Sequence, residues 1–81
     1  MNTGIEILKA MQAQGYQVRT DDVDEAAVAA FVAQAQGMEP AQVRAVAERM
    51  LKALERNSNP FGKNASFATV AAAADRLMAS L

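Results

Sequence analysis

The chain carries its most regular helical pattern in GMEPAQVRAVAERMLKALER, residues 37–56. From Val43 to Leu54, apolar side chains recur at steps of three and four residues, and charged or amide side chains fill most of the positions between them. Pro40 suits the first turn of a helix, because the amide proton that proline lacks would have no partner within the helix there. The pattern therefore predicts an amphipathic helix over residues 40–56 with one face in a core.

Glycines and a polar run divide the rest of the chain into three more helical segments. Gly15 and Gly37 stand where a left-handed residue commonly ends a helix. The polar run from Asn57 to Lys63 is expected to form a loop, with Phe61 packed into the core. We therefore predict a single all-α domain over residues 1–81, with short helices at about 3–14, 22–36, 40–56 and 66–80.

Polar residues mark the starts of the second and fourth predicted helices. Either Thr20 or Asp22 is placed to cap the second helix, and with Asp22 as the cap, Glu25 completes a capping box. Asn64 or Ser66 is expected to cap the fourth helix. Carboxylates near the start of the second helix also complement the positive end of its dipole, so these acids have a structural explanation.

The composition limits both the core and the available chemistry. The chain has 81 residues, 19 of them alanine, and a chain this short buries only about 60% of the surface that it exposes when unfolded. It contains no cysteine and no histidine, which excludes disulfides, thiol nucleophiles and imidazole bases. We expect a protein that is not an enzyme and holds no metal or cofactor. No apolar run approaches the roughly 20 residues that span a bilayer, so we expect no membrane segment and a cytoplasmic location.

Charge is divided unevenly along the chain, although the net charge is only −1. Residues 1–40 contain two cations and six acids, whereas residues 41–81 contain six cations and three acids. This asymmetry suggests an acidic surface at residues 21–25 and a basic surface on the third helix. The basic residues are Arg44, Arg49, Lys52 and Arg56. Two ordinary solvated helix faces would give the same pattern.

Residues 32–46, VAQAQGMEPAQVRAV, join the second and third predicted helices. A valine–alanine pair is followed after three residues by glycine, an apolar residue, a cap residue and two valines. This spacing resembles the helix-turn-helix of bacterial repressors, most nearly the lactose-repressor type. The resemblance implies that Ala33 lies at the helix crossing, and that the third helix enters a DNA major groove. It also implies buried anchors at Met38, Val43 and Val46, and a recognition helix that begins with Pro40, Ala41, Gln42, Arg44 and Ala45. For a DNA-binding protein, we predict the contacts at Gln42, Arg44, Arg49 and Lys52. Any two capped helices joined by a glycine turn give a similar pattern.

The apolar residues exceed what the predicted core can bury. The second helix has an apolar stripe of Val23, Ala26, Ala27, Ala30 and Phe31, with further apolar side chains beside it. We therefore predict a partner-binding surface at Ile7, Val28 and Val32, on the first and second helices. The predicted function is a small protein-binding module of the adaptor or inhibitor type. A helix-turn-helix DNA-binding regulator is the alternative, and a subunit of a homo-oligomeric assembly is the third hypothesis.

Overall fold

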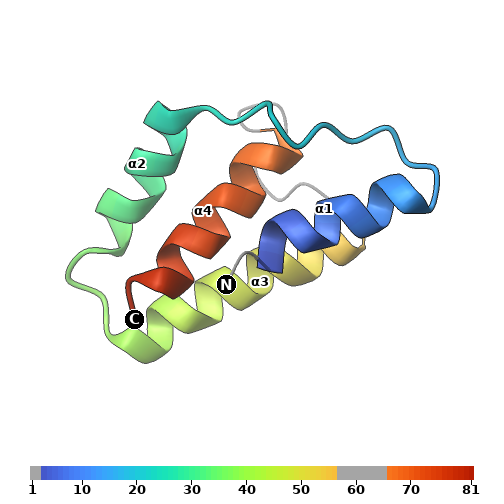
Figure 1. The fold of residues 1–81 in the computed structure, drawn as a ribbon. Helices are drawn as coiled ribbons and strands as arrows, with labels where there is room; N and C mark the ends of the chain where they lie inside the picture. The colour runs from blue at the N-terminus through green and yellow to red at the C-terminus, as the bar shows by residue number, and fades with distance from the viewer. Residues whose placement is uncertain (1–2, 57–65) are drawn as a thin grey trace.

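The computed structural model describes residues 3–56 and 66–81 (Figure 1). These residues form four helices and no strand: α1 (Thr3–Ala13), α2 (Glu25–Ala35), α3 (Pro40–Glu55) and α4 (Phe67–Ala79). The predicted all-α fold is confirmed. No helix in these ranges is both long and apolar enough to cross a membrane. The predicted loop at 57–63, with Phe61, and the alternative cap Asn64 lie outside the described residues.

α4 is the central helix, and each of the other three packs against it. Figure 1 shows α4 between α2 and α1, with α3 running below. Seven of the 13 residues of α4 are buried, and four of the seven are alanines. Because side-chain size sets the distance between packed helix axes, these small residues let the neighbouring helices approach closely. The alanines of α4 therefore have a packing role.

Gly4 makes a close contact between α1 and α4. A Cβ atom at Gly4 would lie 2.6 Å from the backbone oxygen of Ala71, a distance too short for a real side chain. The Asp75 carboxylate on α4 fixes the same contact, because it accepts hydrogen bonds from the backbone nitrogens of Gly4 at 2.7 Å and Ile5 at 3.4 Å. These amides lie in the first turn of α1, where they have no partner within the helix. The two helices are thus held by backbone contact and by a cap.

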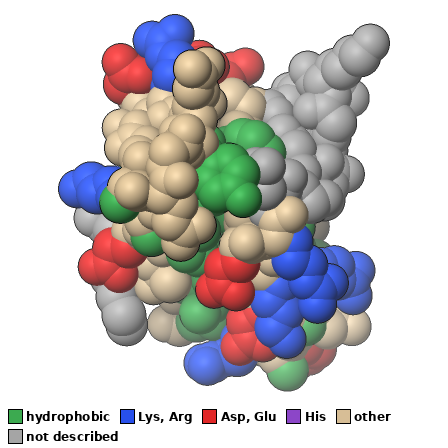
Figure 2. Space-filling model, turned by 90° about the vertical axis from the view of Figure 1, so that its right-hand side faces the viewer, with side chains coloured by type: hydrophobic (Ala, Val, Ile, Leu, Met, Phe, Trp, Pro, Cys, Tyr) green, Lys and Arg blue, Asp and Glu red, His purple; other side chains and the backbone are tan. Residues whose placement is uncertain are grey.

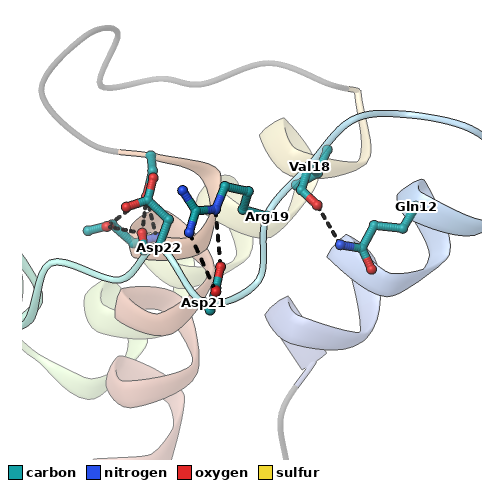
Figure 3. A network of polar contacts seen from close by, with 7 residues as sticks. Gln12, Val18, Arg19, Asp21 and Asp22 are labelled. Atoms are coloured by element: carbon teal, nitrogen blue, oxygen red, sulfur yellow. Dashed lines mark hydrogen bonds and ion pairs between the residues drawn. The ribbon is translucent and has the colours of Figure 1, made fainter.

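A polar cluster ties the start of α4 to the segment before α2 (Figure 3). Ser66 caps α4, as expected, by accepting from the backbone nitrogen of Thr69 at 3.1 Å. The Ser66 hydroxyl also donates to the carbonyl of Asp22 at 2.5 Å, and the Thr69 hydroxyl accepts from the backbone nitrogen of Asp24 at 3.0 Å. Thr69 is only 1% exposed, so this cluster satisfies a buried polar side chain.

α2 begins later than predicted. Its cap is Asp24, whose carboxylate accepts from the backbone nitrogens of Ala26 at 3.1 Å and Ala27 at 3.2 Å. The expected caps, Thr20 and Asp22, were wrong. The physical reason is tertiary: the backbone of Asp22 is held by the hydroxyls at the start of α4, and the chain stays extended through Asp24.

Both glycine turns are confirmed. Gly15 has a φ of 100° and Gly37 a φ of 88°, in the left-handed region that favours glycine. After α1, the backbone nitrogen of Tyr16 donates to the carbonyl of Met11 at 3.1 Å, as in a Schellman motif. The C-terminal ends of α1 and α2 are therefore set locally, by the glycine turns that follow them.

The buried face of α2 differs from the predicted stripe. Val28 is the one fully buried residue of this helix, and Val32 and Ala35 are partly buried against the core. Ala26 and Ala30 are exposed, so the prediction was wrong at these positions. α2 is apolar over most of its circumference, and its sequence period therefore does not select the side that faces α4.

Candidate functional site

α2 and α3 follow one another in the chain, but they do not pack as a pair. Each lies against α4 instead, and Figure 1 shows the C-terminal half of α4 between them. The left-handed Gly37 turns the chain after α2, and Pro40 begins α3. The backbone nitrogen of Glu39 donates to Oε1 of Gln42 at 3.1 Å, as part of a capping box. The turn between the two helices is thus defined by local hydrogen bonds.

A groove of about 150 Å³ lies at this joint, and we call it the α2–α3 groove. Its lining is apolar apart from one glutamine: Phe31, Gln34, Ala35, Met38, Val43, Val46 and Leu77. Val43 and Leu77 belong to the buried core, whereas Met38 is 36% exposed. A flexible, polarizable methionine at the edge of an apolar groove suits a surface that adapts to a partner.

A second hollow, of about 340 Å³, continues the apolar surface past Met38. Its lining includes Val32, Pro40 and Leu81, and it shares Met38 with the α2–α3 groove. Leu81 is 47% exposed. Three large hydrophobic side chains are exposed in the described ranges, and two of them, Met38 and Leu81, lie at these adjoining hollows. The exposed apolar surface is therefore concentrated here.

The outer surface of α3 carries three cations, Arg49, Lys52 and Arg56, which we call the basic ridge. They line a shallow hollow together with Ala45, Glu48 and Ala53. Figure 2 shows Lys and Arg side chains gathered over α3, with Asp and Glu side chains beside them. Within residues 3–56 and 66–81, none of the three ridge cations makes an ion pair. The ridge therefore carries three cations without an ion pair in the described chain, with one acid, Glu48, in the same hollow.

Three of the four acids at residues 21–25 are, in contrast, engaged within the chain. Arg19 Nε donates to Asp21 Oδ1 at 3.2 Å (Figure 3); this hydrogen bond lowers the pKa of Asp21 and raises the pKa of Arg19. Glu25 Oε2 lies 3.7 Å from the guanidinium of Arg76 on α4, and Asp24 caps α2. In the described part of the chain, no group of three or more acids is placed to hold a metal ion.

The predicted partner surface at Ile7, Val28 and Val32 is not formed. Val28 is 0% exposed, because α2 directs it into the core beside α4. Ile7 and Val32 are partly buried and pack against the core, and α4 lies between their helices (Figure 1). The prediction was therefore wrong for Val28, and the three side chains do not share one surface. Val32 does border the second hollow.

The four residues predicted to contact DNA are exposed, but they do not share one face of α3. At about 100° per residue, Arg44 lies roughly 140° around the helix from Arg49. Gln42 uses its side chain in the capping box at the start of α3, whereas Arg49 and Lys52 belong to the basic ridge. Arg44 therefore lies well round α3 from Arg49, but only about 80° around the helix and two turns along it from Lys52.

The anchors implied by the repressor resemblance are only partly buried. Val43 is buried as expected, and Val46 is half-buried. Ala33 is exposed and Met38 is one-third exposed, so these two expectations were wrong. The reason is that α2 packs on α4, which leaves Ala33 on the outer side of α2.

The sequence patterns missed the groove because they treat each helix alone. They assign Phe31 and Val46 to inward faces. They do not show that α2 and α3 both pack against α4 and leave a space between them. One usable signal was Met38, an apolar residue between Gly37 and Glu39 in a turn. Comparison with protein-family models, with curated proteins and with solved structures gave no match.

Proposed function

We propose that this chain is a cytoplasmic, non-enzymatic protein-binding module, and that it accepts an apolar segment of its partner in the α2–α3 groove. The observation that carries the proposal is Met38, which is exposed at the junction of two apolar hollows. Contiguous apolar surface of this kind, bordered by polar residues, is characteristic of protein interaction sites. Gln34 and Gln36 supply such a polar border.

The shape of the site favours a helical or extended segment as the bound element. Amphipathic helices commonly place their apolar face in a groove between two helices of a receptor. Here the walls come from α2 and α3, and Leu77 of α4 lines the groove between them. Because the groove is small, a few apolar side chains of the partner would fill it.

A DNA-binding regulator is the second candidate, and the basic ridge, whose cations make no ion pair within the described residues, is the observation in its favour. Net charge −1 and the presence of Glu48 among the ridge cations weigh against it, because DNA binding generally requires a distinctly basic face. A gel-shift titration with duplex DNA at low salt distinguishes the two candidates. Tight, sequence-selective binding that Arg44→Ala abolishes would establish the regulator instead.

The test of the proposed function compares two variants that each remove one exposed apolar side chain. Met38→Gln alters the groove, and Tyr16→Gln is the matched control, because Tyr16 is 44% exposed after α1 and lines neither hollow. Each tagged chain is used to recover partners from its native cells, and the recovered proteins are quantified by mass spectrometry. We expect a partner that wild type and Tyr16→Gln recover and that Met38→Gln loses.

Equal recovery by all three chains would contradict the proposal. Light scattering on the purified chain tests the homo-oligomer hypothesis. A stable dimer that Met38→Gln dissociates would make a second copy of the chain the partner.

A further inference from the structure

The α2–α3 groove and the basic ridge meet along one line of α3. Val46 lines the groove, and Arg49 follows it at a step of three residues. Ala53 and Arg56 continue the line at steps of four and three. Residues at these spacings are neighbours on a helix surface, and the line extends about 15 Å from Val46 to Arg56. A segment seated in the groove and running along α3 would therefore pass the ridge.

The distribution of charge makes the two parts of this surface different, because the α2–α3 groove is apolar and the basic ridge is positive. Three of the four acids at residues 21–25 interact with Arg19, with Arg76 or with the first turn of α2, and Asp75 binds the first turn of α1. The ridge cations have no ion pair within the described residues. Within the described residues, the hollow beside the apolar groove thus holds three cations without an ion pair and one acid, Glu48.

We infer that the partner segment is amphipathic and acidic: apolar side chains occupy the α2–α3 groove, and aspartate or glutamate side chains lie along the basic ridge. This inference rests on the proposed function and names the chemistry of its partner. Exposed charges attract a complementary partner and select its orientation more than they add affinity. The apolar groove supplies the anchor, and the ridge discriminates against neutral and basic segments.

A protein segment fits this surface better than a nucleic acid does. The groove lining offers apolar side chains and a single amide, Gln34, so it supplies few donors for phosphate. Glu48 lines the same hollow as the ridge cations, and Glu39 stands at the start of α3. A continuous phosphate backbone would meet these carboxylates, whereas separate acidic side chains on a peptide avoid them.

The experiment selects binders from a yeast-displayed library of random 16-residue peptides, with the full chain as the target. We expect selected peptides to contain apolar residues at helical spacing and more Asp and Glu than Lys and Arg. For individual peptides, affinity should fall about tenfold with Arg49→Glu/Arg56→Glu. The matched control, Lys9→Glu/Arg44→Glu, changes net charge equally away from the ridge and should alter affinity less than twofold. Circular dichroism verifies that both variants remain helical.

The outcomes separate this inference from the proposed function. The selected peptides could have apolar residues but no acidic excess, and bind less tightly to Met38→Gln but equally well to Arg49→Glu/Arg56→Glu, the ridge reversal. That result would overturn the inference of an acidic partner and would still support binding in the α2–α3 groove. If no peptide is selected, or if Met38→Gln leaves the affinity of every selected peptide unchanged, both are overturned. Duplex DNA binding stronger than peptide binding, and abolished by the ridge reversal, would assign the ridge to nucleic acid.

Discussion

The contact of α1 with α4 and the joint between α2 and α3 are built in opposite ways. At the first, Gly4 lies against the backbone of Ala71, and Asp75 caps the helix that it touches. At the second, the helices do not pack as a pair, and an exposed Met38 stands over an apolar groove. The comparison shows that small residues and a polar cap fill one contact of α4, whereas the other region keeps an exposed apolar side chain. We call the contact of α1 with α4 the closed contact and the joint between α2 and α3 the open joint.

The largest effect is expected at the closed contact, from Gly4→Val. A side chain there collides with the backbone of Ala71, which a rotamer change cannot relieve. We expect the free energy of unfolding to fall by about 3 kcal/mol, at the upper end of the usual cost of overpacking. Chemical denaturation measures it. A loss below about 0.5 kcal/mol would show that α1 does not approach α4 as closely as described.

At the open joint, the most sensitive position is Gly37. Its φ of 88° is strained for a β-branched residue, so Gly37→Val should destabilise the chain by about 1 to 3 kcal/mol. Thermal melting followed by circular dichroism measures the change, and Gly37→Asn serves as a control because asparagine tolerates this conformation better. If valine and asparagine melt alike, the turn is not left-handed.

Removal of the Asp75 carboxylate tests the cap at the closed contact. Asp75→Ala leaves two amides of α1 without their acceptor, and we expect a loss of about 1 kcal/mol, typical of a capping residue. Amide hydrogen exchange should increase at Gly4 and Ile5. Unchanged protection of these two amides would mean that the carboxylate does not cap α1 in solution.

The smallest effect on stability is expected from Met38→Gln. Because Met38 is one-third exposed and belongs to the groove edge, its replacement should change the free energy of unfolding by less than about 0.5 kcal/mol. Denaturation alongside Gly4→Val gives the comparison directly. A loss of unfolding free energy as large as that of Gly4→Val would show that Met38 is a core residue and that the open joint is not accessible.

Much of the fold is predictable from local signals in the sequence. Gly15, Gly37 and Pro40 set helix ends through backbone conformation, and the amphipathic period of α3 identifies its buried face, so these predictions hold. The start of α2 was not predictable, because it depends on the hydrogen bond from the Ser66 hydroxyl to the carbonyl of Asp22, and these two residues lie far apart in the chain.

The candidate site was harder to predict for a related reason. α2 is apolar on nearly every side, so only the position of α4 decides that Val28 is buried and that Met38 is left at an edge. Residue spacing within one helix carries no information on a groove that two helices form with a third. Burial of Val28 and exposure of Met38 are consequences of tertiary packing.

The most direct test of the groove uses methyl NMR of the chain labelled at its methionine methyl groups. Met11 and Met50 are buried in the core, and Met38 is exposed at the groove, so the methyl signals report separate places. When a peptide selected on the full chain is added, we predict that the Met38 methyl signal shifts most, while those of Met11 and Met50 stay nearly unchanged. A bound peptide that leaves Met38 unshifted, or that shifts Met11 most, would contradict docking in the α2–α3 groove.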